Sequence, residues 1–154
     1  MRRAAAVLTL VVLFALPGVV AAQSTTDGTP RADDLVGTAG PDQISGRGGN
    51  DTIRGRAGDD KLAGGRGDDL VSGDAGRDGI SGGPGNDTLL GGAGNDRISG
   101  GMGTDFVAGG VGNDIVRVRD GAADRVTCGA GRRDRVVADA QDSVARDCEV
   151  VQRG

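Results

Sequence analysis

Residues 37–117 consist of nine consecutive copies of a nine-residue unit: GTAGPDQIS, GRGGNDTIR, GRAGDDKLA, GGRGDDLVS, GDAGRDGIS, GGPGNDTLL, GGAGNDRIS, GGMGTDFVA and GGVGNDIVR. Glycine occupies the first and fourth positions of every copy, aspartate the sixth, and an aliphatic residue the eighth. The second position is glycine in five copies, and the other four carry Thr38, Arg47, Arg56 and Asp74. A period held without insertion indicates units that stack on their neighbours.

Each unit predicts a turn followed by a short strand. Glycine at fixed offsets supplies the positive φ or the close backbone approach of a tight turn, and the x-aliphatic-x triplet makes a strand with one inward side chain. Two units then close one coil, and stacked coils pair their strands in two parallel sheets. The sequence therefore predicts an all-β fold, a parallel β-roll (a β-helix solenoid) of nine nonapeptide repeats. Its core is expected to be two facing ladders: Ile44, Leu62, Ile80, Ile98 and Val116 in one, and Ile53, Val71, Leu89 and Val107 in the other.

The aspartates at the sixth position predict a ligand. They are Asp42, Asp51, Asp60, Asp69, Asp78, Asp87, Asp96, Asp105 and Asp114. Aspartates two copies apart lie one coil apart, about 4.8 Å, where two carboxylates repel by about 3 kcal/mol at an effective dielectric constant of about 20. A divalent cation between them would turn repulsion into attraction, and a flexible all-oxygen shell suits Ca²⁺ better than Mg²⁺; the two ladders predict about five to seven ions. Thiolate-bound metals are excluded because the array has no cysteine.

The composition of the 154-residue chain narrows the classes of function. It has no His, Trp or Tyr and a formal net charge of −4. A Ser-His-Asp triad and His-ligated zinc are therefore excluded, and nucleic acid is not an expected partner, since an aromatic stacking platform and a basic surface are missing. Leu, Ile, Val and Phe make up 23 of the 132 residues after position 22, too few for an ordinary core. Calcium binding is therefore expected to drive folding.

Four segments follow one another along the chain. Residues 1–22 have the features of a signal peptide: Arg2 and Arg3, an apolar run over 4–16, and small residues at 20–22. Residues 23–32 are expected to form a polar linker, 33–117 the calcium-binding roll and 118–154 a C-terminal cap. The predicted location is secreted and extracellular, with no membrane span after signal cleavage, because the apolar run is too short for a good span.

The C-terminal segment carries looser units and both cysteines. Asp-x-Val units begin at Asp124, Asp134 and Asp142, so the coil is expected to continue with loosened turns and to cap the solenoid. Cys128 and Cys148 are an even pair in a chain expected to be secreted, so a disulfide is the default prediction. A metal pair or catalytic thiols are the alternatives, and the absence of His and of a C-x-x-C motif disfavours both.

The pattern G-G-x-G-x-D-x-aliphatic-x resembles the hemolysin-type calcium-binding nonapeptide repeats, called RTX, of secreted bacterial proteins. The resemblance covers residues 37–117 and implies a calcium-loaded β-roll with the nine aspartates as ligands. It also implies backbone carbonyl ligands from turn positions one and three: Gly64, Arg66, Gly82, Pro84, Gly91, Ala93, Gly100, Met102, Gly109 and Val111. No toxin, protease or lipase domain accompanies the array, so the chain is similar to small stand-alone members of the family and is not expected to be an enzyme.

Two other classes of function remain as alternatives. A calcium-stiffened adhesive or interaction protein of the cell envelope would use an outward face. Positions seven and nine point outward, and on one sheet they include Leu70, Leu90 and Phe106, a candidate surface for self-association or for an envelope partner. A surface-binding solenoid of the ice-binding kind needs a regular rank of Thr or Asn on one outward face. Here Asn fills position five in only four copies, so the rank is too broken to favour ice binding.

Overall fold

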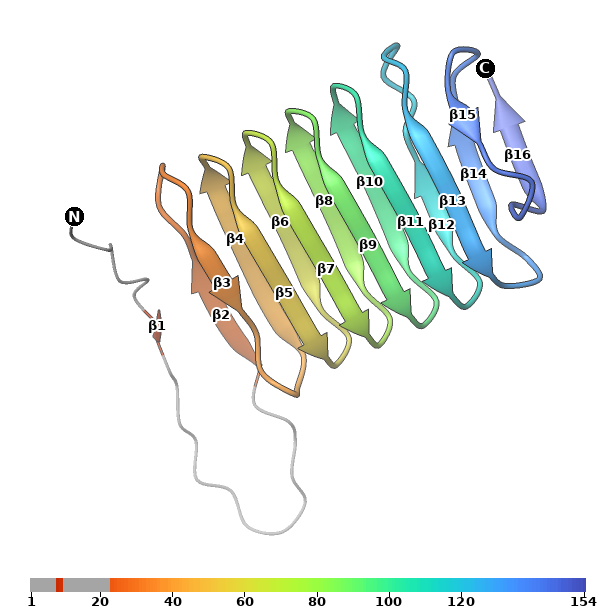
Figure 1. Cartoon of the computed structure of the whole chain (residues 1–154). Coiled ribbons are helices and arrows are strands. Elements are labelled where there is room, and N and C mark those ends of the chain that lie inside the picture. Colours follow the sequence, from red (N-terminus) through yellow and green to blue (C-terminus); the bar gives the residue numbers. More distant parts are fainter. Residues whose placement is uncertain (1–7, 10–22) are drawn as a thin grey trace, which may run out of the picture.

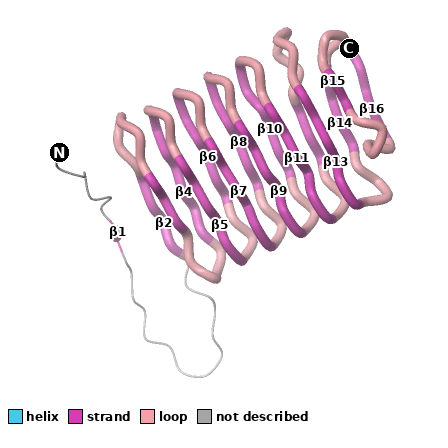
Figure 2. The backbone as a smooth tube through the Cα atoms, in the orientation of Figure 1, coloured by secondary structure: helices cyan, strands magenta, loops and turns pink. Residues whose placement is uncertain are grey.

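The computed structural model describes residues 8–9 and 23–154, and the strands of this part of the chain wind into a solenoid (Figure 1). Sheet A contains, in spatial order, β1 (Leu8–Thr9), β2 (Ser24–Asp27), β4 (Asp42–Gly48), β6 (Lys61–Arg66), β8 (Gly79–Pro84), β10 (Arg97–Met102), β12 (Ile115–Arg117), β14 (Arg135–Ala138) and β16 (Val150–Arg153). Sheet B contains β3 (Asp34–Val36), β5 (Thr52–Ala57), β7 (Leu70–Ala75), β9 (Thr88–Ala93), β11 (Phe106–Val111), β13 (Arg125–Ala130) and β15 (Ser143–Val144). Short turns join the two sheets along both edges (Figure 2).

The core consists of the two predicted aliphatic ladders. Residues 18 apart are parallel partners, as Ile44 with Leu62 and Ile53 with Val71 show. The ladder residues are at most 3% exposed. Leu35 extends one ladder at its start, and Val126 and Val136 extend the two ladders beyond the array. The all-β parallel β-roll is therefore confirmed.

The strands are longer than the sequence pattern predicted. Most strands of the array span six residues and include the first three positions of the next unit, so the turns contain only positions four to six. Strand pairing continues through the second residue of the unit even though that residue has a positive φ. Gly65, with φ 116°, pairs with Arg47 in this way. Arg47, Arg56 and Asp74 take the same left-handed conformation, with φ between 70° and 82°. Such a φ is strained for a residue with a Cβ.

Strand pairing of the solenoid begins before residue 33, within the segment 23–32 for which a linker was predicted. Strand β2 (Ser24–Asp27) is parallel to β4, and Thr26 lies in register with Ile44. Gly28, Asp33 and Leu35 hold the first, sixth and eighth positions of a further unit, in which Arg31 replaces the fourth-position glycine. The sheets contain about seven coils, more than nine units alone would form.

The C-terminal segment closes the solenoid. Strands β13, β14, β15 and β16 continue both sheets, and Cys128 and Cys148 form a disulfide with their Cα atoms 5.2 Å apart. Within residues 8–9 and 23–154, no helix has the length and apolar character needed to cross a membrane. The predicted signal peptide lies outside the described residues except for β1, which pairs antiparallel to β2.

Candidate metal sites

The sixth-position aspartates lie at the solenoid edges and point inward. Those of the array are at most 3% exposed. They form two rows, and within each row the carboxylates are linked from coil to coil. The backbone N–H of Asp42 donates to Asp60 Oδ1 at 2.8 Å, and that of Asp60 donates to Asp78 Oδ1 at 2.9 Å. Each row is therefore a continuous column of carboxylates along the solenoid. Oδ1 of each carboxylate accepts a hydrogen bond from the aspartate N–H of the preceding coil.

The second oxygen of most of these carboxylates has no partner. Oδ2 is buried and makes no hydrogen bond in Asp51, Asp60, Asp69, Asp78, Asp87, Asp96, Asp105, Asp114, Asp124 and Asp134. A buried polar atom without a partner costs about 1–3 kcal/mol, and more when it is charged. Ten such atoms in two columns are therefore a large destabilisation unless something binds them.

The first-position glycines allow these oxygens to approach the backbone closely. A Cβ placed on Gly73 would lie 2.6 Å from the Gly91 carbonyl oxygen and still closer to Asp78 Oδ2. A Cβ on Gly109 would lie 2.5 Å from Asp114 Oδ2. Glycine is required because a methyl group would occupy the space that the carboxylate and a carbonyl of the next coil share. An all-oxygen set with carboxylate charge matches the donors that Ca²⁺ prefers.

The predicted carbonyl ligands fall into two groups. Gly64, Gly91, Gly100 and Gly109 present their carbonyl oxygens at these spaces, and Gly82 holds the same position on β8. The third-position carbonyls accept hydrogen bonds of 2.7–3.0 Å from fourth-position glycines one coil earlier; they belong to Arg66, Pro84, Ala93, Met102 and Val111. A carbonyl has two lone pairs, so each of these keeps one for a cation.

Burial raises the pKa of the ten aspartates whose Oδ2 has no partner. It raises the pKa of Asp60 and Asp96 to about 6 and that of Asp105 to about 7, and neighbouring carboxylates raise these pKa values further. The backbone N–H that each carboxylate accepts opposes the rise only in part. The columns therefore bind protons tightly in the absence of a metal, and a cation would compete with protons for the same oxygens.

The first aspartate in each row differs from those that follow. Asp33 Oδ2 accepts from the backbone N–H of Thr29 at 2.6 Å, and Asp42 Oδ2 accepts from that of Thr38 at 2.5 Å. Ser24 Oγ also donates to Asp42 Oδ1. The departure at Thr38 from second-position glycine therefore has a structural effect, because this threonine satisfies the carboxylate of its own turn.

Sequence reasoning missed two features of the turns. Fifth-position side chains link successive coils, since Asn50 Oδ1 accepts from the N–H of Asp68, and Asn86 Oδ1 from that of Thr104. The sequence pattern predicted that the coil continues at Asp124 and Asp134, but not that their carboxylates continue the two buried rows, because the spacing to them departs from nine-residue multiples. The Asp-x-Val units at these positions were the signal for the second feature.

A family model described as the RTX calcium-binding nonapeptide repeat matches four overlapping segments, residues 27–62, 46–80, 55–89 and 81–116. Together these matches span more than half of the chain. The chain belongs to the RTX calcium-binding nonapeptide repeat family. The first match begins at residue 27, in agreement with the early start of the solenoid. No curated protein matches the chain.

Membership of the RTX family agrees with the architecture and with the donor set. RTX repeats bind Ca²⁺ in general, serve structural or binding roles more than catalytic ones, and typically belong to extracellular bacterial proteins. The cysteines are not part of the RTX ladder. Cys128, Cys148 and Asp147 lie together, but the disulfide leaves neither thiol free to bind a metal.

Proposed function

We propose that this protein is a secreted, non-catalytic calcium-binding β-roll that folds when Ca²⁺ binds between its stacked turns. The observation that carries the proposal is the column of buried aspartate Oδ2 atoms without hydrogen-bond partners, beside the spaces left by first-position glycines. Asp51, Asp60, Asp69, Asp78, Asp87, Asp96, Asp105 and Asp114 are its carboxylate ligands. Asp42 contributes less, because Thr38 already satisfies it.

Bound Ca²⁺ supplies positive charge that offsets the repulsion within each column. The protein residues do the rest: the aspartate backbone N–H groups orient each carboxylate through Oδ1, which leaves Oδ2 turned toward the first-position glycine. The first-position carbonyls add oxygens from the adjacent coil. Since an ion absent from the unfolded chain stabilises only the folded state, binding energy becomes folding energy.

Two further features support secretion as part of the proposal. The segment 1–22 has the composition of a signal peptide. The disulfide between Cys128 and Cys148 is typical of proteins that fold in an oxidising compartment.

The absence of His from the whole sequence agrees with a binding role, because the most common general base is missing.

The experiment is far-UV circular dichroism of residues 23–154 with chelator and with millimolar Ca²⁺, and with Mg²⁺ as the matched control. The expected result is a disordered spectrum in chelator, a strand spectrum in Ca²⁺, and little change in Mg²⁺. A chelated protein with the same spectrum and melting temperature as the calcium form would overturn the proposal.

A second candidate role, as a calcium-stiffened interaction or self-associating protein, rests on one surface. Leu70 is 39% exposed on β7, and the half-buried Leu90 and Phe106 lie on the next two strands of sheet B. Sedimentation in calcium of the wild type and of a Leu70→Ser, Phe106→Ser variant tests this role. An associating wild type and a monomeric variant would support it, and a monomeric wild type would refute self-association.

A further inference from the structure

The two rows of buried aspartates do not stop at the last nonapeptide. The N–H of Asp105 donates to Asp124 Oδ1 at 2.8 Å, and the N–H of Asp114 donates to Asp134 Oδ1 at 2.7 Å. The sequence separation grows from 18 residues to 19 and 20, yet the hydrogen-bond pattern is the same. Both aspartates lie beyond residue 116, where the match to the RTX repeat model ends.

Both carboxylates have the same unmet requirement as those of the array. Asp124 is 2% exposed and Asp134 is fully buried. Oδ2 of each makes no hydrogen bond. The carboxylates of Asp120, Asp139 and Asp142 add negative charge around Asp124. A purely structural cap would be expected to satisfy or omit such groups, because a buried unpaired carboxylate oxygen is costly.

Further oxygens converge at the step between the coils of Asp114 and Asp134. A Cβ on Gly131 would lie 2.6 Å from Asp134 Oδ2 and still closer to the Gly112 carbonyl oxygen. A Cβ on Gly109 would lie 2.8 Å from the carbonyl oxygen of Cys128, which replaces the first-position glycine carbonyl of the array. Carboxylate and carbonyl oxygens of adjacent coils therefore face a shared space here as well.

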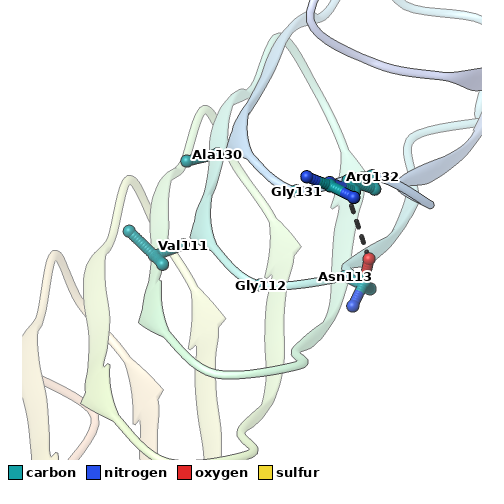
Figure 3. Close-up of a pocket in the computed structure, with 6 residues that line it drawn as sticks. All are labelled: Val111, Gly112, Asn113, Ala130, Gly131 and Arg132. Atoms are coloured by element: carbon teal, nitrogen blue, oxygen red, sulfur yellow. Dashed lines mark hydrogen bonds between the residues drawn. The ribbon is translucent and has the colours of Figure 1, made fainter.

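The surface above this step has a shallow, open depression. A hollow of about 420 Å³ lies between the two turns and is lined by Gly112, Asn113, Gly131 and Arg132, together with Val111 and Ala130 (Figure 3). The N–H of Arg132 reaches Asn113 Oδ1 at 3.3 Å, so the fifth-position link between coils is lengthened here. The longer turn that ends at Asp134 thus leaves this step open to solvent.

The ends of the rows contrast with Asp124 and Asp134. Oδ2 of the next aspartate, Asp142, accepts from the N–H of Asp139 at 2.6 Å. At the other end, Asp33 and Asp42 accept from the threonine N–H groups of their own turns. In these three carboxylates a backbone N–H within the same turn takes the place that a cation would fill.

We propose that Asp124 and Asp134 each complete a further Ca²⁺ site in the disulfide-bonded segment, beyond the nonapeptide array, and that the ions of one row lie between Asp33 and Asp142 while those of the other row begin after Asp42. This inference rests on the proposed function of the array. It assigns calcium-dependent order to residues 118–138, which the disulfide alone would not provide. The N–H groups of Thr29, Thr38 and Asp139 terminate the rows, because each occupies Oδ2 of the aspartate in its own turn.

Ion counting in matched variants tests the proposal. Wild type, Asp124→Asn, Asp134→Asn and Asp142→Asn, all with the disulfide intact, are equilibrated with saturating Ca²⁺, and bound ions per chain are counted by equilibrium dialysis. Asp124→Asn and Asp134→Asn should each bind one ion fewer than wild type, and Asp142→Asn should bind the wild-type number. Wild-type counts in folded Asp124→Asn and Asp134→Asn would overturn the proposal. A wild type that binds no calcium would overturn the proposed function with it.

Hydrogen exchange of the wild type provides a readout that does not depend on the variants folding. Peptides that cover residues 119–138 should exchange slowly in Ca²⁺ and rapidly in chelator while the Cys128–Cys148 bond stays intact. If these peptides were equally protected in both conditions while array peptides responded to calcium, the cap would need no ion. That result would overturn the inference and leave the proposed function of the array standing.

Discussion

Acid should partly replace calcium in stabilising the fold. Asp60, Asp96 and Asp124 have pKa values of about 6 in the fold, and Asp105 of about 7, against 3.8 for an unshifted aspartate, mainly because of burial. Since the folded pKa is raised, the folded state binds protons more tightly than the unfolded state. The stabilisation that these protons give to the calcium-free fold is therefore fully present below about pH 4. It is lost as the pH rises through 6 to 7.

The steepness of this dependence follows from the number of protons. Near pH 5 these four carboxyls are largely protonated in the fold and ionised in the unfolded chain. Each proton contributes about 1.4 kcal/mol per pH unit, so the free energy of unfolding should fall by about 5 kcal/mol per pH unit in this range. A change of one pH unit would therefore remove more than half of the free energy of unfolding that many small domains have. Folding in the absence of calcium should therefore switch over a narrow range of pH.

The assay is far-UV circular dichroism of calcium-depleted protein between pH 4 and pH 8, with the same series in millimolar Ca²⁺ as the control. Strand signal should be greatest at acidic pH without calcium and should be held to pH 8 by calcium. Asp105→Asn removes one titrating group, so its transition should be shallower and displaced to a different pH. A calcium-free strand signal that is independent of pH, or that grows as the pH rises, would refute the reasoning.

Three further perturbations have expected outcomes. Asp78 lies in mid-row, so Asp78→Asn should impair two calcium sites. Asp42→Asn should impair at most one, because Thr38 already satisfies the Asp42 carboxylate. Calcium titration calorimetry compares the two variants, and equal losses would contradict the row model. Arg56→Gly should raise the free energy of unfolding by up to about 1 kcal/mol in calcium, because it relieves a φ of 82°. Arg54→Gly on the same strand has no such strain to relieve and should lower the free energy of unfolding by about 0.5–1 kcal/mol, so equal effects in urea unfolding would remove the explanation by strain. Reduction of Cys128–Cys148, which closes a loop of 20 residues, should cost about 3 kcal/mol and should increase hydrogen exchange mainly after residue 117; uniform loosening of the whole solenoid would contradict a local role.

The ladders could be predicted because their signal is strictly periodic. An aliphatic residue at the eighth position of every nine-residue unit allows one register, so Ile44 must stack on Leu62 and Ile53 on Val71. The two rows of aspartates, one coil apart, followed from the same period. The strand lengths could not be predicted, because glycine at positive φ usually marks a turn, and here Gly65 and Gly83 remain within strands.

Both ends of the solenoid were harder to predict for different physical reasons. At the start, Arg31 replaces a turn glycine, and Ser24 and Thr26 take inward positions that aspartate and an aliphatic residue hold elsewhere. This coil could not be predicted from the sequence because its inward residues are polar, although its backbone pairs with the next coil as in the array. At the end, extra residues in the turns before Asp124 and Asp134 break the nine-residue period without breaking the row. Hydrogen bonding to the preceding coil, which no single-sequence pattern displays, is what keeps these carboxylates aligned.

The number of calcium ions per folded chain tests the central claim most directly. Native mass spectrometry of oxidised residues 23–154 at saturating Ca²⁺ should find at least five ions, released together when a chelator unfolds the chain. Cooperative release is expected because adjacent coils share carboxylate and carbonyl oxygens. A folded chain that carries one or two ions, or none, would contradict the account, because the buried columns from Asp51 to Asp134 would then be stable without a cation.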